Sequence, residues 1–216
     1  MCGRFVGNFS TQALLDEILA AVPDIRVGLE PGAPDKVANF NTAPTQAVPI
    51  LIRQSDDLVV RTARWGLLPV WSKDPAAASK MINARSETVL EKPAFRNLVR
   101  RNRCLVPASG YYEWSTELGP YKSKQPFYIS NEDSSLLPMA GIFEEWVNPI
   151  SGELVTSTAN EIERTPTAAR RAFIKSGVGV AGLKLLKVCK TSKSQDSRSS
   201  LAACTASPLA SGSSGN

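Results

Sequence analysis

The sequence predicts an α+β domain that is rich in strands and has a few peripheral helices. Most apolar runs are short, carry many Val, Ile and aromatic residues, and lie between Pro, Gly or Asp residues, which is the pattern of strands. One segment near the N-terminus instead has the spacing and the cap of an amphipathic helix. Fourteen of the fifteen aromatic residues lie at or before Trp146, so we expect the core in that part of the 216 residues.

The first helix is expected at residues 11–22. Ser10 precedes it as an N-cap, apolar residues recur at helical spacing, and Pro23 ends it. Residues 28–49 follow with four prolines, which predicts a loop with short extended pieces. A second, shorter helix is expected at residues 93–99.

The strands are expected in two groups. The first is a hairpin in which residues 48–53 and 58–66 flank an acidic turn at 55–57. The second group follows a loop rich in Pro, Trp and Lys, and it consists of residues 103–107, 110–114, 125–129, 138–146 and 154–159. These strands and helices predict one β-rich domain over residues 1–163.

Residues 164–216 form a tail of different composition. Residues 1–163 hold 16 Lys and Arg against 19 Asp and Glu, whereas the tail holds 9 against 1, so the net charge of +5 comes from the tail. From residue 191 onward, 11 of 26 residues are Ser or Thr, which is typical of a solvated, partly disordered end. The basic total therefore gives no evidence of phosphate binding by the body of the protein. A Gly-x-Gly-x-x-Gly match at 177–182 lacks a β-α-β unit and does not indicate a dinucleotide site.

The cysteine and histidine content excludes several kinds of site. The four cysteines lie far apart and the chain has no histidine, so the sequence predicts neither a metal site nor a cofactor. Any general acid or base must be a carboxylate, a lysine, a tyrosine or the N-terminal amine. Free thiols fit a reducing compartment, and no apolar run is long enough to span a bilayer. We therefore expect a cytoplasmic protein with no membrane contact.

Cys2 directly follows the initiator methionine, which is normally trimmed before a small side chain. The mature chain would then begin with a free 1,2-aminothiol, whose amine titrates near ~8 and whose thiol titrates near ~8.5. An aldehyde can condense with the amine and then with the sulfur to form a thiazolidine ring. The same group can attack an amide with its own amine as base. On position alone, an ordinary early residue is the commoner case.

Two further segments place polar groups in apolar surroundings. Glu113 lies between Tyr112 and Trp114, and a carboxyl group buried among aromatic rings becomes suited to proton transfer near neutrality. A surface glutamate on an edge strand is the commoner reading of this segment alone. Asn83 and Arg85 would share one face if extended, where they could hold the polar end of a substrate. Either could instead belong to a helix cap or a turn.

Several segments occur in the order and spacing of one known family. They are MCGRF (1–5), NTAP (41–44), RWGLLPVW (64–71), INARSET (82–88), RCLVP (103–107), GYYEW (110–114) and AGIF (140–143). With them the chain resembles the SOS-response-associated peptidase (SRAP) family, the abasic-site processing proteins. The resemblance favours a functional role for both Cys2 and Glu113.

The resemblance implies a protein of the DNA damage response that links covalently to abasic sites. Cys2 would supply the amine and thiol to the aldehyde of the ring-opened sugar. Asn83 would position the amine and the sugar, and Glu113 would act as the acid and base in ring opening and dehydration. No cofactor is implied.

The resemblance also implies a monomer that binds single-stranded DNA, with which it would associate in the nucleoid. Arg4 and Arg85 would bind flanking phosphates, because the paired donors of a guanidinium suit phosphate geometry. Pro44, Trp65 and Trp71 would form apolar surface beside the strand, with one tryptophan stacking on a base.

The resemblance ends before a histidine of the family. Its members continue past the last matched strand into a His-x-Arg-Met-Pro-like segment, whose histidine is held to assist ring opening and reversal of the link. Residues 164–170 occupy that place here without a histidine. A frameshifted or replaced C-terminus would explain the change in composition, and a family-like continuation in another reading frame would support it.

Three functions are compatible with these observations. The first is a protein that crosslinks to abasic DNA and whose reversal or lyase step is impaired. The second is a thiol-dependent peptidase or autoprocessing hydrolase, which needs only a free Cys2 and an amide target. The third is a non-catalytic relic of the family, which the missing histidine favours. We rank them in that order.

Overall fold

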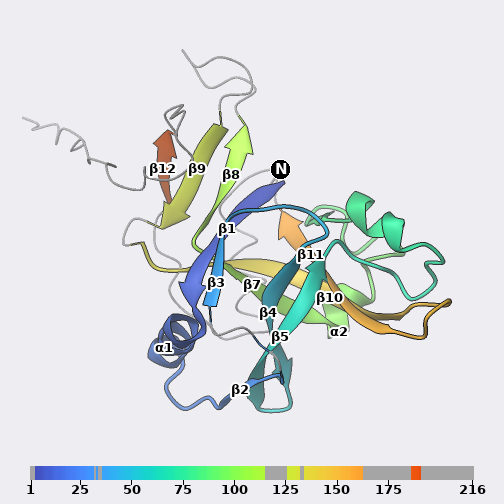
Figure 1. Cartoon of the computed structure of the whole chain (residues 1–216), viewed down its shortest axis with the longest axis horizontal. Helices are drawn as coiled ribbons and strands as arrows, with labels where there is room; N and C mark the ends of the chain where they lie inside the picture. The colour runs from blue at the N-terminus through green and yellow to red at the C-terminus, as the bar shows by residue number, and fades with distance from the viewer. Residues whose placement is uncertain are drawn as a thin grey trace, which may run out of the picture.

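Two β-sheets make up most of the described chain (Figure 1). The computed structural model describes residues 3–31, 33, 36–114, 126–131, 134–162 and 186–190. Its elements are β1 (Arg4–Ser10), α1 (Thr11–Ala21), β2 (Val27–Leu29), β3 (Lys36–Thr42), β4 (Ala47–Gln54), β5 (Asp57–Trp65), the 3-10 helix η1 (Pro75–Lys80), β6 (Asn83–Arg85), α2 (Leu98–Arg101), β7 (Arg103–Ala108), β8 (Gly110–Trp114), β9 (Pro126–Asn131), β10 (Leu137–Val147), β11 (Leu154–Ile162) and β12 (Leu186–Lys190). The smaller sheet has the order β12-β9-β8-β1-β3, and the larger has the order β2-β5-β4-β7-β10-β11-β6.

The larger sheet closes into a barrel. β5 pairs with β4 and also, in parallel, with β11, where Arg64 lies opposite Ser157 and Trp65 lies opposite Thr158. Five strands thereby form a closed ring in the order β5, β4, β7, β10 and β11. The ring closes where β5 meets β11; β2 pairs with β5, and β6 pairs with β11. Closure removes strand edges that would otherwise be open to pairing with other chains.

The barrel encloses the main hydrophobic core. Ile50, Trp65 and Val106 are fully buried there, at 0% exposed. Phe5 of β1 belongs to the same cluster, and its ring meets that of Trp65 edge-on with centroids 4.9 Å apart. The smaller sheet is therefore joined to the barrel at the first residues of the chain.

The α+β class and the strand-rich character are confirmed. α1 begins where the cap predicts, because Ser10 Oγ accepts a hydrogen bond from the Ala13 N–H at 3.0 Å. The predicted hairpin is present as β4 and β5, which pair in antiparallel register from Ala47 opposite Arg64 to Gln54 opposite Asp57. Strands β7, β8, β9, β10 and β11 lie at the predicted positions.

Three elements differ from the sequence expectation. The helix predicted at 93–99 is wrong in its extent: residues 92–97 form turns, and α2 begins only at Leu98. The Phe95 N–H and the Arg96 N–H both donate to the Lys92 carbonyl oxygen, which closes a single turn instead of a continuous helix. β1 and β3 are full strands of seven residues each that local composition did not indicate. They form because each pairs with the other over most of its length.

Part of the predicted tail is described. β12 pairs in antiparallel register with β9, so the smaller sheet includes five residues of the segment 164–216. The remainder of the tail, including residues 177–182, lies outside the described residues, and its predicted disorder stays a prediction.

No helix in the described ranges has both the length and the apolar content that crossing a membrane requires.

Candidate functional site

The N-terminal strand brings the start of the chain beside β8. β1 and β8 are antiparallel, with Arg4 opposite Tyr112. Gly3 is the residue before β1, and Glu113 is the residue of β8 that follows Tyr112. Cys2 itself lies outside the described residues.

Glu113 is partly buried on a central strand. β8 pairs with β1 on one side and with β9 on the other, so Glu113 does not lie on a sheet edge. Its partner on β9 is the buried Phe127, and its neighbour Trp114 is 40% exposed. Whether aromatic rings tune this carboxylate for proton transfer stays a prediction.

Trp65 is fully buried, and the prediction that it contacts DNA is wrong. Its exposed fraction is 0%, its ring packs against Phe5, and its Nε1–H donates to the Ile82 carbonyl oxygen at 3.0 Å. A ring without exposed surface cannot stack on a base. Trp65 instead connects β1 to the residue that precedes Asn83, and so joins two of the predicted site segments.

Asn83 begins β6 and is partly buried. β6 is parallel to β11, and the residue opposite Asn83 is Asn160, which is 1% exposed. The Asn160 N–H donates to the Ile82 carbonyl oxygen at 3.0 Å, the same oxygen that Trp65 contacts. Sequence reasoning missed Asn160. The available signal was a polar residue that ends a run of small, strand-forming residues.

Arg4 and Pro44 lie near each other around the end of β5. Arg4 Nη1 donates to Asn41 Oδ1 at 3.1 Å, close to the end of β3. Pro44 follows in the next turn, and the Thr45 N–H donates to the Trp65 carbonyl oxygen at 2.7 Å. Arg4 is thus bonded to the end of β3, and the turn that contains Pro44 is bonded to the buried Trp65.

Trp71 and Arg85 are exposed. Trp71 is 59% exposed and its neighbour Val70 is 60% exposed, in the loop that follows β5. That loop leaves the barrel through Gly66, whose φ of +127° favours glycine and where an added Cβ would lie 2.5 Å from the Ala78 carbonyl oxygen. The Trp65-Gly66 pair of the sequence therefore has a steric reason: a buried ring is followed at once by a turn that only glycine fits.

Cys104 is a buried thiol in the barrel core. Burial raises its pKa to about 12, against a smaller opposing effect of its contact with Thr158 Oγ1 at 3.5 Å. It therefore remains a neutral thiol near pH 7 and is unsuited to nucleophilic attack. Among the described residues, no group of three or more His, Cys, Asp and Glu side chains is placed to hold a metal ion.

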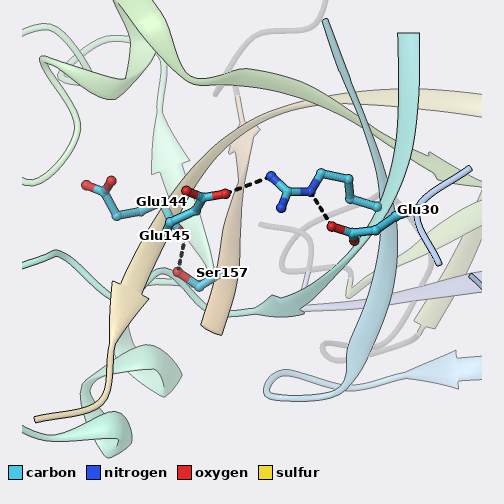
Figure 2. Close-up of polar contacts among 5 residues, drawn as sticks. Glu30, Glu144, Glu145 and Ser157 are labelled. Carbon is cyan, nitrogen blue, oxygen red and sulfur yellow. Dashed lines mark hydrogen bonds and ion pairs between the residues drawn. The ribbon is translucent and has the colours of Figure 1, made fainter. Parts of the chain in front are cut away.

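A separate polar cluster lies further along the barrel. Arg61 donates from Nε to Glu30 Oε1 at 2.9 Å and from Nη1 to Glu145 Oε1 at 2.7 Å. Figure 2 shows Glu30 and Glu145 on either side of the guanidinium, with Glu144 pointing away from it. Burial lowers the pKa of Arg61, but the hydrogen bonds and charges of the two carboxylates outweigh it and the pKa is raised. A pocket of about 810 Å³ opens here, and none of the predicted site residues lines it.

Comparison with known proteins identifies the family. The family model described as SOS response associated peptidase (SRAP) matches residues 1–168. The chain belongs to this family. It is 35% identical over 158 residues to the abasic site processing protein YoqW of Bacillus subtilis (strain 168), which covers 73% of this chain and 66% of that protein. It is 34% identical over 145 residues to the abasic site processing protein HMCES of Gallus gallus, which covers 53% of this chain and 42% of that protein. The chain thus spans less than two thirds of each relative's length.

Solved structures of other proteins share the fold. A protein from Bacteroides thetaiotaomicron aligns with a TM-score of 0.56 and 26% identity over 80% of this chain and 72% of its own. A protein from Bordetella bronchiseptica aligns with a TM-score of 0.62 over 88% of this chain and all of its own, at 19% identity, which is evidence of fold alone.

Proposed function

We propose that this protein binds abasic sites in single-stranded DNA and forms a thiazolidine crosslink with them through Cys2. Two relatives are named abasic site processing proteins, and the family is shared. The observation that carries the proposal is the β1–β8 register, in which Arg4 lies opposite Tyr112, so that the start of the chain is directed toward Glu113, the next residue of β8. Crosslinking requires the terminal amine and an acid–base group within reach of one carbon atom, and this register supports that arrangement.

The chemistry balances without a metal or an oxidant. After Met1 is removed, the amine of Cys2 adds to the aldehyde carbon of the ring-opened sugar. The resulting carbinolamine loses water to give an imine, and Glu113 donates the proton to the departing hydroxyl. The sulfur of Cys2 then adds to the same carbon while its proton passes to the nitrogen, and the thiazolidine ring closes. The net change is the loss of one water molecule.

The remaining residues act on the DNA. Asn83 holds the amine and the sugar oxygen, because a carboxamide offers both a donor and an acceptor. Arg4 and Arg85 contact phosphates on either side of the lesion. Trp71, with its exposed ring, packs against a base next to the gap, and Pro44 supports the same apolar surface.

The test is a denaturing gel of the protein mixed with single-stranded DNA that carries one abasic site. Intact mass first establishes that the chain begins at Cys2. A shifted band is expected for the native protein and none for Cys2→Ala. For Glu113→Gln, the shifted band should accumulate more slowly. Glu153→Gln is the matched control, because it makes the same charge change at an exposed position on the β10–β11 hairpin. A native protein that gives no band would refute the proposal.

Reversal of the crosslink is proposed to be slow. Residues 164–170 lack the family histidine, and they lie outside the described residues. Loss of one proton-transfer group costs about 10²- to 10⁴-fold in the step it serves. Crosslinks should therefore persist after a large excess of competing 1,2-aminothiol is added, whereas rapid exchange would contradict this part of the proposal.

A peptidase activity is the second candidate, favoured by the description of the family itself. The Cys2 thiol would attack a carbonyl carbon, with the terminal amine as base. This activity predicts hydrolysis of a peptide that abasic DNA does not inhibit. Hydrolysis that continues in the Cys2→Ala variant would exclude it.

A further inference from the structure

A buried carboxamide lies beside Asn83 with both of its polar atoms unsatisfied. Asn160 is 1% exposed, and neither its Oδ1 nor its Nδ2 has a hydrogen-bond partner within the described residues. Buried polar side chains are paired in the large majority of cases, because an unpaired one costs free energy. An apolar residue would be more stable at this position, so the amide is expected to have a use that the unliganded fold does not show.

Strand geometry directs Asn160 and Asn83 to the same face. The two residues are opposite each other on parallel strands, and side chains at paired positions project in the same direction. Their neighbours Ala159 and Ala84 both pack into the cluster on the other face, together with Leu67. Because side chains alternate along a strand, both asparagines point toward the barrel interior.

The Asn83–Asn160 pair is linked by contacts to the first strand of the chain. The Ile82 carbonyl oxygen accepts hydrogen bonds from the Asn160 N–H and from Trp65 Nε1, both at 3.0 Å. Trp65 in turn contacts Phe5, three residues after Cys2. A continuous set of contacts therefore joins Asn160 to the strand that carries the proposed nucleophile.

We propose that Asn160 is a positioning residue, which fixes the carboxamide of Asn83 while the crosslink forms. The inference rests on the proposed function. Full burial keeps Asn160 from touching DNA, so it acts through Asn83, the neighbouring polar side chain on its face. The terminal torsion of an asparagine is soft, and a turn of Asn83 about it lets the N–H of one amide donate to the oxygen of the other. The second polar end of Asn83 is then held toward the amine and the sugar.

The test compares Asn160→Leu with the native protein, since leucine removes the polar atoms and keeps the number and branching of the side-chain heavy atoms. The crosslinking rate at saturating abasic DNA should fall about 10- to 100-fold, as expected for a displaced catalytic group. Binding of the same DNA, measured in a Cys2→Ala background, should change less than twofold, and the melting temperature should stay equal or rise. The double variant Asn83→Leu with Asn160→Leu should react no more slowly than Asn83→Leu alone.

Two further variants keep the outcome decisive. Ser157→Ala removes the Ser157 Oγ acceptor of the Leu68 N–H on the opposite face of β11, so it should lower the melting temperature without slowing the crosslink. Asn160→Asp keeps the volume and one acceptor oxygen, and it should recover part of the rate even if the leucine variant does not fold. Crosslinking at the native rate in folded Asn160→Leu would overturn the inference. So would a double variant whose loss of rate equals the product of the two single losses. A native protein that forms no crosslink would refute the proposed function itself.

Discussion

The Arg61 region and the Asn160 region of the barrel differ in how their polar side chains are paired. In one, Arg61 donates to both Glu30 and Glu145. In the other, the Asn160 amide has no hydrogen-bond partner within the described ranges. Arg61 and Trp65 are four residues apart on β5, so at about 3.3 Å per residue the regions are about 13 Å apart.

The difference separates a structural region from a reactive one. Paired charges stabilise the strands that carry them, whereas unpaired buried amides lower stability and are kept where chemistry requires them. The pocket lies at the structural region, and the first residues of the chain approach the other. The site that we propose therefore lies away from the pocket.

The largest effect is expected at the reactive region. Glu113→Gln should slow crosslinking about 10²- to 10⁴-fold, because the amide cannot transfer a proton. The melting temperature should change little, since the shape of the side chain is kept. Rapid-quench gels and thermal melts measure the two effects, and an unchanged rate would remove Glu113 from the mechanism.

A substitution in the Arg61 region should have the opposite effect: it should lower stability and leave the crosslinking rate unchanged. Arg61→Met removes the partner of Glu30, which is partly buried, and of Glu145, which is exposed, and should cost about 1 kcal/mol of unfolding free energy, with an unchanged crosslinking rate. Arg53→Met is the matched control, because the Arg53–Asp56 pair is long at 3.8 Å and largely exposed, so its loss should cost less than about 0.5 kcal/mol. Denaturant titration measures both. Slower crosslinking in Arg61→Met would contradict the assignment of a purely structural role to the Arg61 region.

Exposed aromatic surface should affect binding alone. Trp71→Ala should weaken binding of abasic single-stranded DNA about 10- to 100-fold, because one base–aromatic stack is worth about 1–3 kcal/mol. Ile150→Ala removes a side chain that is 92% exposed on the β10–β11 hairpin and should leave binding unchanged. Fluorescence anisotropy distinguishes them, and equal effects would show that Trp71 has no specific contact.

The smallest effect concerns Cys104 and alkaline pH. Its pKa is about 12 in the fold and 9.0 as the ordinary value, so the folded state favours the protonated thiol. The stabilisation is complete below pH 9 and is lost as pH rises toward 12; by pH 10 the loss is about 1 kcal/mol. The difference in unfolding free energy between the native protein and Cys104→Ala should shrink accordingly between pH 8 and pH 10. A constant difference would contradict a buried neutral thiol.

The sequence predicted the strands whose apolar residues signal burial, and it missed those defined by pairing. The β4–β5 hairpin and the strands from β7 to β11 were evident, because Val, Ile and aromatic residues fill them. β1 and β3 contain Gly and Asn and become strands through each other. Trp65 was placed on the surface because a motif gives the identity of a residue but not the side of the strand it faces. Asn160 was missed because its position beside Asn83 depends on the parallel pairing of β6 with β11, which local sequence does not give.

The central claim is that the start of the chain is the reactive group, and intact-mass spectrometry tests it directly. The protein, beginning at Cys2, is incubated with single-stranded DNA bearing one abasic site, and the Cys2→Ala variant is treated in parallel. The account predicts an adduct whose mass equals protein plus DNA less one water, absent from the variant. No adduct, or an equal one with Cys2→Ala, would contradict it.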